Sequence, residues 1–242
     1  MNEKKFEAVI FDMDGVLIDS EPVHDEAIRM VLHLHADEIP DGHTVADAPM
    51  PFDGFGTTVM DDFRKYCALY PYKVQPEEML QDYIRMIHRI LERDGGYPAM
   101  PHVKAYVRNL HAAGLKLAVA SSSTMQEILE NMEAIDLADC FDRLASGADL
   151  PKGKPDPAVF LHAAKLLGVE PENCVVVEDT DVGLTAAKAA GMAAIGFVSP
   201  HTYNQTLALA DLVVEGFEEM DAEATEEVWT RVHAGRCPSP DC

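Results

Sequence analysis

The sequence predicts an α/β fold with a doubly wound, mostly parallel sheet and an all-helical insertion after the first strand. Short apolar segments alternate with helical patterns along most of the chain, and the strongest apolar segments each end in a polar residue. One early region has helical periodicity only. Alternation of strand and helix is typical of a parallel sheet that is covered by helices on both faces.

Six short apolar segments predict the strands of this sheet. The three strongest are residues 7–12, 115–121 and 174–179, because each is a short apolar run of the kind found in buried parallel strands. Weaker candidates are residues 141–146, 193–198 and 212–214.

Helical patterns lie between these segments. Residues 103–113, 158–167 and 184–190 are each followed by a glycine, which is the expected signal just past a helix end. The alternation of these helices with the strands predicts a Rossmann-like core.

Residues 18–96 break the alternation. Residues 27–34 and 77–91 have helical periodicity, residues 36–56 are rich in Asp, Pro and Gly and predict a loop, and residues 94–98 predict a hinge. We therefore expect two domains, a catalytic core of residues 1–17 and 97–242 and a helical cap of residues 18–96. A cap placed over the strand ends could act as a lid that excludes water.

Bulk composition limits the partners and the compartment. The formal net charge of −23 repels nucleic acid and anionic membranes, so we expect neither as a partner. The sequence contains neither an apolar run long enough to span a membrane nor the apolar core of a signal peptide. Its five cysteines are scattered, and these features together favour a reduced, cytoplasmic setting. A monomer is the default expectation. The negative charge also means that phosphate chemistry here needs a local cationic site.

Polar side chains follow the strongest strands. Asp12, Ser121, Glu178 and Asp179 stand at the carboxyl ends of three predicted strands, which is where open parallel sheets bind ligands. A carboxylate at the position of Asp12 is suited to attack on phosphorus. Asp14 could reach the same phosphate and transfer protons, if the chain coils at Gly15. The alternative is a solvated turn after a buried strand.

These segments resemble the motifs of the haloacid dehalogenase superfamily, in the right order and across nearly the whole chain. Residues 10–20 (IFDMDGVLIDS) resemble motif one and residues 119–122 (VASS) motif two. Residues 153–157 (GKPDP) resemble motif three, and residues 177–183 (VEDTDVG), continuing to 189–192 (AAGM), resemble motif four. The subgroup that the chain resembles most is the beta-phosphoglucomutase-like phosphatases, which carry a helical cap after motif one.

The resemblance implies catalytic roles for four residues and a phosphate-binding role for a fifth, Ser122. Asp12 would be the nucleophile and Asp14 the general acid and base. Ser121 would hold a phosphoryl oxygen with help from the Ser122 amide, and Lys154 would bridge Asp12 and the transferring phosphoryl group.

Two of these assignments have alternatives. Ser121 could be an ordinary helix N-cap, since a helix starts near Thr124, although a helix N-terminus is itself an anion site. Lys152 is the rival of Lys154, which is favoured because the family motif places the lysine directly before proline.

The resemblance also implies a Mg²⁺ site. Asp179 would be a direct ligand and Glu178 a ligand directly or through water, with the Asp12 side chain and the Asp14 backbone carbonyl completing the set. Oxygen-only ligands favour Mg²⁺. The alternative is an acidic helix start. Asp181 departs from the small residue usual in this motif, and the sequence assigns it no role.

Asp14 favours phosphate ester chemistry, because an alkoxide leaving group needs protonation and a halide does not. We therefore expect a phosphatase acting on a small phosphorylated metabolite such as a sugar phosphate. The alternative is a beta-phosphoglucomutase-type mutase. The family's mutases carry an arginine in the first cap loop, where this chain has Thr57 after Gly54. His24 matches a cap-hinge histidine of the mutases, or is simply a half-buried helix histidine.

The mutases' later cap lysine has no evident equivalent in this chain either. Four cations of the cap could substitute for the missing groups: Arg64, Lys65, Arg85 and Arg89. Gly54, Thr57 and His24 are the cap residues that we expect to contact substrate. A more remote alternative is a non-enzymatic phospho-receiver module, which the long insertion argues against.

Overall fold

The structure is a computed structural model that describes residues 5–36, 59–70, 72–201 and 205–234. The chain divides into two compact units, which are described separately. The first, here called the α/β unit, comprises Met1–Asp19 and Pro98–Cys242. The second, called the helical unit, comprises Ser20–Tyr97.

The α/β unit is built on a six-stranded sheet whose strands are all parallel. Its strands are β1 (Ala8–Phe11), β2 (Lys116–Ser121), β3 (Arg143–Ser146), β4 (Cys174–Glu178), β5 (Ala193–Phe197) and β6 (Leu212–Val214). Their spatial order is β3-β2-β1-β4-β5-β6. The predicted fold class is confirmed, with a wholly rather than mostly parallel sheet. Each of the six predicted segments contains one strand.

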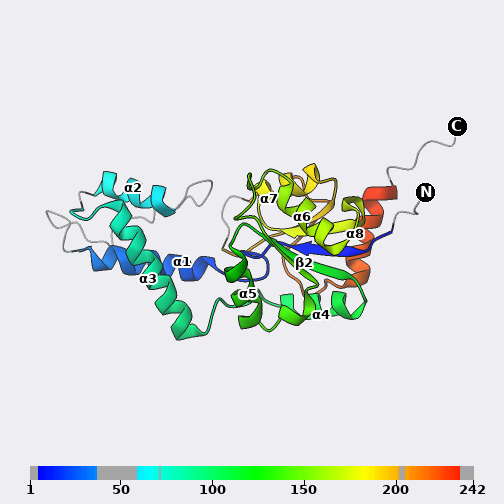
Figure 1. Ribbon diagram of the computed structural model, residues 1–242, viewed down its shortest axis with the longest axis horizontal. Helices are drawn as coiled ribbons and strands as arrows, with labels where there is room; N and C mark the ends of the chain where they lie inside the picture. The colour runs from blue at the N-terminus through cyan, green and yellow to red at the C-terminus, as the bar shows by residue number, and fades with distance from the viewer. Residues whose placement is uncertain (1–4, 37–58, 71, 202–204, 235–242) are drawn as a thin grey trace. The chain divides into compact units, whose positions relative to one another are not determined.

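Helices cover both faces of this sheet (Figure 1). On one face α6 (Ala158–Leu167) and α7 (Asp181–Ala189) pack against strand residues such as Ile10 and Val176. On the other face lies α4 (Val103–Ala112), whose Tyr106 ring meets Phe11 edge-on at 5.7 Å. Figure 1 shows α5 (Met125–Ala134) on the same side as α4. The sheet is therefore buried on both faces, which accounts for its almost continuously apolar strands.

Two helices of the α/β unit differ from expectation. Helix α7 begins at Asp181 rather than at 184, because the Thr180 side chain accepts a hydrogen bond from Gly183 N and caps the helix three residues earlier. The helix α8 (Ala222–Ala234) was not predicted, since it buries only Thr225, Val228 and Trp229 within an acidic segment. Its apolar stripe is too narrow to stand out in the sequence.

The helical unit contains three described helices: α1 (Glu21–Leu34), α2 (Val59–Leu69) and α3 (Pro76–Asp94). Its core includes Val31, Phe63, Tyr66 and Met79. Helix α1 begins six residues before the predicted segment, because a proline is tolerated in a first helical turn. The predicted loop over residues 36–56 falls outside the described residues from residue 37 onward.

The helical unit is inserted close to the carboxyl end of β1. Asp19 N donates to Pro98 O at 2.8 Å, and Ile18 and Ala99 form an antiparallel bridge. The chain therefore leaves and re-enters the α/β unit at neighbouring points. Among the described helices, none combines the length and the apolar character that a membrane span requires.

Candidate active site

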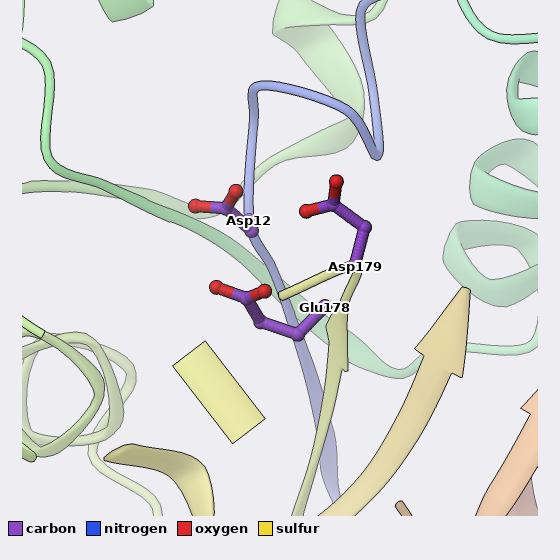
Figure 2. A group of neighbouring side chains, drawn as sticks. All are labelled: Asp12, Glu178 and Asp179. Atoms are coloured by element: carbon purple, nitrogen blue, oxygen red, sulfur yellow. The ribbon is translucent and has the colours of Figure 1, made fainter. Parts of the chain in front are cut away.

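Three carboxylates gather at the carboxyl ends of β1 and β4. Phe11 pairs with Val177 across the two strands, and Asp12 N donates to Val177 O at 3.0 Å, so the residues that follow are neighbours. Asp12, Glu178 and Asp179 are all buried, and each places a carboxylate oxygen within 4.8 Å of the others (Figure 2). These side chains from distant parts of the sequence therefore share one small space.

A lysine lies against this cluster. Lys154 Nζ donates to Asp12 Oδ1 at 2.6 Å and to Glu178 Oε1 at 2.7 Å, and its side chain is only 10% exposed. The ammonium group also lies 4.9 Å from the centre of the Phe160 ring. Lys152 is exposed and lies 3.7 Å from Asp156. The geometry thus brings Lys154 to the carboxylates and leaves Lys152 at the surface.

The charges of the cluster perturb one another. Burial disfavours the ammonium of Lys154, but the carboxylates of Asp12 and Glu178 outweigh it and hold the pKa of Lys154 above its ordinary value. Burial raises the pKa of Asp12 to about 7; the Lys154 charge opposes this shift, while Glu178 and Asp14 add to it. The cluster holds three buried carboxylates, two of which pair with the Lys154 ammonium, so it is suited to a further cation.

The donor set and the surrounding backbone fit a hard divalent cation such as Mg²⁺. All three side chains offer carboxylate oxygens. The loop after β1 approaches them closely at Gly15, where a Cβ would lie 2.3 Å from Asp179 Oδ2 and where φ is +77°. At Gly183 in α7, a Cβ would lie 1.7 Å from Glu178 Oε1. Glycine at these two positions leaves the space that the carboxylates occupy.

Hydroxyl groups hold the neighbouring parts of the site. Thr180 donates to Glu178 Oε2 from its backbone N at 2.7 Å and from its Oγ1 at 2.9 Å. At the end of β2, the buried Ser121 accepts from Ser123 N at 3.1 Å, and Ser123 Oγ lies 3.4 Å from Asp14 Oδ2. Ser122 is exposed. Motif-one and motif-two residues are thus linked through Ser123.

Ser146 at the end of β3 was missed by sequence analysis. Its Oγ donates to Ser123 O at 2.7 Å and accepts from Ala148 N at 3.2 Å. A polar residue at the end of a weakly predicted strand is the only sequence signal that could have indicated it.

The alternative role of Ser121 as a helix N-cap is wrong. The N-cap of α5 is Thr124, which accepts from Glu127 N while the Glu127 carboxylate accepts from Thr124 N at 2.8 Å. This reciprocal pair is a capping box. Thr124 and Glu127 therefore cap the first turn of α5, and Ser121 belongs to the end of β2 instead.

The cap residues of the prediction lie in the helical unit. Gly54 and Thr57 fall outside the described residues. His24 Nδ1 lies 2.5 Å from the Tyr83 hydroxyl, and the ring also contacts Tyr97.

The four candidate substitute cations all have neighbours on their own helices. Arg64, Lys65 and Arg85 pair with Asp61, Asp62 and Asp82 respectively, and Arg89 Nη1 lies 3.8 Å from Met86 Sδ.

The structure combines a doubly wound parallel sheet with a carboxylate cluster and a buried lysine at the carboxyl ends of its strands. This is the architecture of the α/β enzymes acting on phosphate that the sequence motifs suggested. The family model described as haloacid dehalogenase-like hydrolase matches residues 6–191, and the chain belongs to this family. Family membership confirms the prediction of an enzyme.

Named relatives cover most of the chain. Hexitol phosphatase B of Escherichia coli is 33% identical over 218 residues, which are 89% of this chain and 95% of the relative. The phosphorylated carbohydrates phosphatase of Thermotoga maritima is 32% identical, over 85% of this chain and 90% of its own. The crystal structure of beta-phosphoglucomutase from Clostridium difficile has a TM-score of 0.71 and covers 95% of this chain and 99% of its own. At 23% identity, that last match supports the fold alone.

Proposed function

We propose that this chain is a Mg²⁺-dependent phosphatase that hydrolyses a small phosphorylated carbohydrate through an aspartyl-phosphate intermediate on Asp12. The observation that carries the proposal is the position of Lys154, whose Nζ lies 2.6 Å from Asp12 Oδ1 and 2.7 Å from Glu178 Oε1. A buried ammonium beside a strand-end carboxylate is suited to drawing a phosphate dianion toward that carboxylate. The E. coli and T. maritima relatives are named for hexitol and for phosphorylated carbohydrates, which supports the substrate class.

Hydrolysis takes two displacements at phosphorus. In the first, an Asp12 carboxylate oxygen bonds to phosphorus, the bond to the ester oxygen breaks, and Asp14 gives its proton to the departing alkoxide. In the second, Asp14 takes a proton from water, the water oxygen bonds to phosphorus, and the bond to Asp12 breaks. Inorganic phosphate leaves, and both aspartates return to their starting protonation states.

The other residues of the site hold the phosphoryl group. The Ser121 hydroxyl, the Ser122 amide and the Lys154 ammonium bind its oxygens. Mg²⁺ would be held by the Asp12 and Asp179 side chains, the Asp14 carbonyl, and Glu178 directly or through water. When bound, the ion supplies positive charge that favours the ionised form of Asp12 and neutralises the phosphate.

The helical unit is proposed to be a cap that excludes water and selects the substrate. Its insertion beside the carboxyl end of β1 supports this role, since only a few residues separate Asp14 from the crossing at Asp19 and Pro98. His24, Gly54 and Thr57 are the residues through which we expect the cap to contact substrate.

A mutase of the beta-phosphoglucomutase type is the second candidate. The presence of His24 at the hinge position favours it. However, a mutase must hold a sugar phosphate for a second attack, and the candidate cations of the cap do not favour that role. Arg64, Lys65 and Arg85 each pair with an aspartate on their own helix. Thr57 stands where the mutases carry arginine. Hydrolysis is therefore preferred.

We further propose that the enzyme is a cytoplasmic monomer without nucleic acid or membrane partners. The free thiols of Cys67, Cys140 and Cys174 support a reducing compartment. The net charge of −23 supports the absence of polyanionic partners.

A panel of hexitol, hexose and other small phosphate esters, assayed for inorganic phosphate with and without Mg²⁺, tests the proposal. We expect Mg²⁺-dependent release, and loss of it by at least about 10³-fold in Asp12→Asn. Full activity in Asp12→Asn would refute the nucleophile. Beta-glucose 1-phosphate should be followed in parallel, because its conversion to the 6-phosphate without net hydrolysis would establish the mutase instead.

A further inference from the structure

The segment that follows β5 contacts the backbone of Asp179. Gln205 Nε2 donates to Asp179 O at 2.5 Å and to Phe197 O at 3.2 Å. The last paired residues of β4 and β5 are Glu178 and Gly196, so Asp179 and Phe197 are the next residues across the two strands. The Gln205 amide therefore bridges the two strands one position beyond the end of their ladder.

Asp181 holds the residue next to Gln205. Its Oδ2 accepts from Thr206 N at 3.0 Å, and its Oδ1 accepts from Thr206 Oγ1 at 2.8 Å. Asp181 is the first residue of α7, where a negative charge is stabilised by the helix dipole. The acidic residue that departs from the family motif is thus engaged in tying the segment after β5 to the start of α7.

The segment is also anchored by packing. Leu207 is buried in the core between the sheet and helices α6 and α7, and it has a positive φ of 49°. A bulky residue adopts this left-handed backbone only when its surroundings impose it. Three consecutive residues, Gln205, Thr206 and Leu207, are therefore fixed by the α/β unit.

We propose that Gln205, Thr206 and Asp181 form a clamp that positions Asp179 for a divalent cation. The clamp acts through the backbone of Asp179: tying its carbonyl to β5 fixes the direction in which its carboxylate points toward Asp12 and Glu178. These are positioning residues. The inference rests on the proposed Mg²⁺ site but not on the identity of the substrate.

The first test is the affinity for Mg²⁺ of the full chain without substrate, measured by calorimetric titration. Gln205→Met keeps the length of the side chain and removes both donated hydrogen bonds. Removing groups that orient a metal ligand typically weakens metal binding by about 10- to 100-fold, and we expect about tenfold here. At saturating Mg²⁺, kcat should return to within about twofold of the wild type, because the clamp touches no reacting atom.

Thr206→Val and Asp181→Asn separate the clamp from simple electrostatics. Thr206→Val removes the hydroxyl and keeps the Asp181 charge, so the clamp predicts weaker Mg²⁺ binding, by about threefold, in this variant as well. A loss confined to Asp181→Asn would overturn the clamp in favour of a charge effect.

Trp229→Phe is the matched control. It also removes one hydrogen bond from a side chain to a backbone carbonyl, since Trp229 Nε1 donates to Glu172 O at 2.8 Å. It should lower the melting temperature without changing the affinity for Mg²⁺. Clamp variants that lower only the melting temperature, with wild-type Mg²⁺ affinity, would overturn the inference. A wild-type protein that takes up no Mg²⁺ would overturn both this inference and the proposed cofactor.

Discussion

Buried acidic groups occur in both units, but their charges are balanced differently. In the helical unit Asp82 is buried, and its two carboxylate oxygens meet His35 Nε2 at 2.9 Å and the Arg85 guanidinium. In the α/β unit, Asp12 and Glu178 both pair with the ammonium of Lys154, and the carboxylate of Asp179 lies in the same cluster, so three carboxylates and one ammonium are gathered there. The first arrangement meets the needs of its carboxylate with side chains, whereas the second has an excess of negative charge.

The difference separates a structural network from a binding site. A buried carboxylate is tolerated when partners from the protein compensate for its lost hydration. Where such partners are too few, binding a cation from solution stabilises the cluster. The raised pKa of Asp12 follows from the same deficit, because burial and neighbouring carboxylates disfavour its ionised form. Changes to each group of charges can test this comparison.

The largest effect is expected from removing the cation of the α/β cluster. Lys154→Met should reduce kcat by about 10²–10³-fold, because Asp12 and the phosphoryl group lose the charge between them. It should also lower the free energy of unfolding of the Mg²⁺-free protein by about 3 kcal/mol, since buried carboxylates lose their partner. Phosphate-release kinetics and urea unfolding measure the two effects.

Arg85→Met is the matched control, since it removes a cation from the buried carboxylate of the helical unit. The Arg85 side chain is 62% exposed, and Asp82 keeps His35 as a partner. We therefore expect a loss of about 1 kcal/mol or less and no change in Mg²⁺ affinity. Equal effects of the two substitutions on catalysis would contradict the distinction between the two groups.

A second large effect is expected from filling the space beside Glu178. In Gly183→Ala the new Cβ would lie 1.7 Å from Glu178 Oε1, so either α7 or the carboxylate must move. We expect Mg²⁺ affinity to fall by about 100-fold, as for a displaced metal ligand or its support. Gly153→Ala is the control, because a Cβ there meets nothing within 4 Å. Wild-type Mg²⁺ binding in Gly183→Ala would show that Glu178 is not needed for the metal.

The residues at the carboxyl ends of the strands were predicted well because each strand has its own local sequence pattern. Six apolar segments located the strands, and parallel strands bring their carboxyl ends together whatever their separation in sequence. The geometry then gathered Asp12, Glu178 and Asp179. Lys154, which is 142 residues from Asp12, was chosen over Lys152 only through the family motif, since spacing alone could not distinguish two lysines of one loop.

The residues that support the site could not be predicted from the sequence, because their long-range hydrogen bonds follow no periodic pattern. Gln205 reaches Asp179 across 26 residues, and Ser146 reaches Ser123 across 23. A glutamine in a loop is most often solvated, and a polar residue at the end of a weakly predicted strand is only a faint signal, so the sequence assigns neither residue to the site. Helices α2 and α8 were missed for a different reason, because their buried faces are narrow and partly polar: α2 buries Asp62 beside two aromatic residues, and α8 buries Thr225 beside Val228 and Trp229.

A tenfold effect is expected from pH. With the pKa of Asp12 near 7 in the Mg²⁺-free protein, its carboxyl group carries a proton below pH 7 that the cation must displace. Mg²⁺ affinity should therefore rise with pH up to about 7 and level off above it. At pH 6 we expect binding about tenfold weaker than at pH 8, with about one proton released per ion.

Calorimetric titrations in two buffers of different ionisation enthalpy measure both quantities. An affinity independent of pH with no proton release would show that Asp12 is ionised before the metal binds, and an affinity that falls as pH rises would contradict the prediction outright. The excess of carboxylates in the α/β unit would then need an explanation other than cation binding.

The smallest effect on the active site is expected from Asp82→Asn in the helical unit. Losing the charge leaves the Arg85 guanidinium without its ionic partner and weakens the hydrogen bond to His35, so the free energy of unfolding should fall by about 2 kcal/mol. Mg²⁺ affinity should stay within about twofold of the wild type, because changes at separate sites without shared partners act independently. Chemical denaturation and Mg²⁺ titration of the same variant give both values. A loss of Mg²⁺ affinity as large as that of Gly183→Ala would mean that this balanced group serves the metal site too, and the division between structural and binding charges would fail.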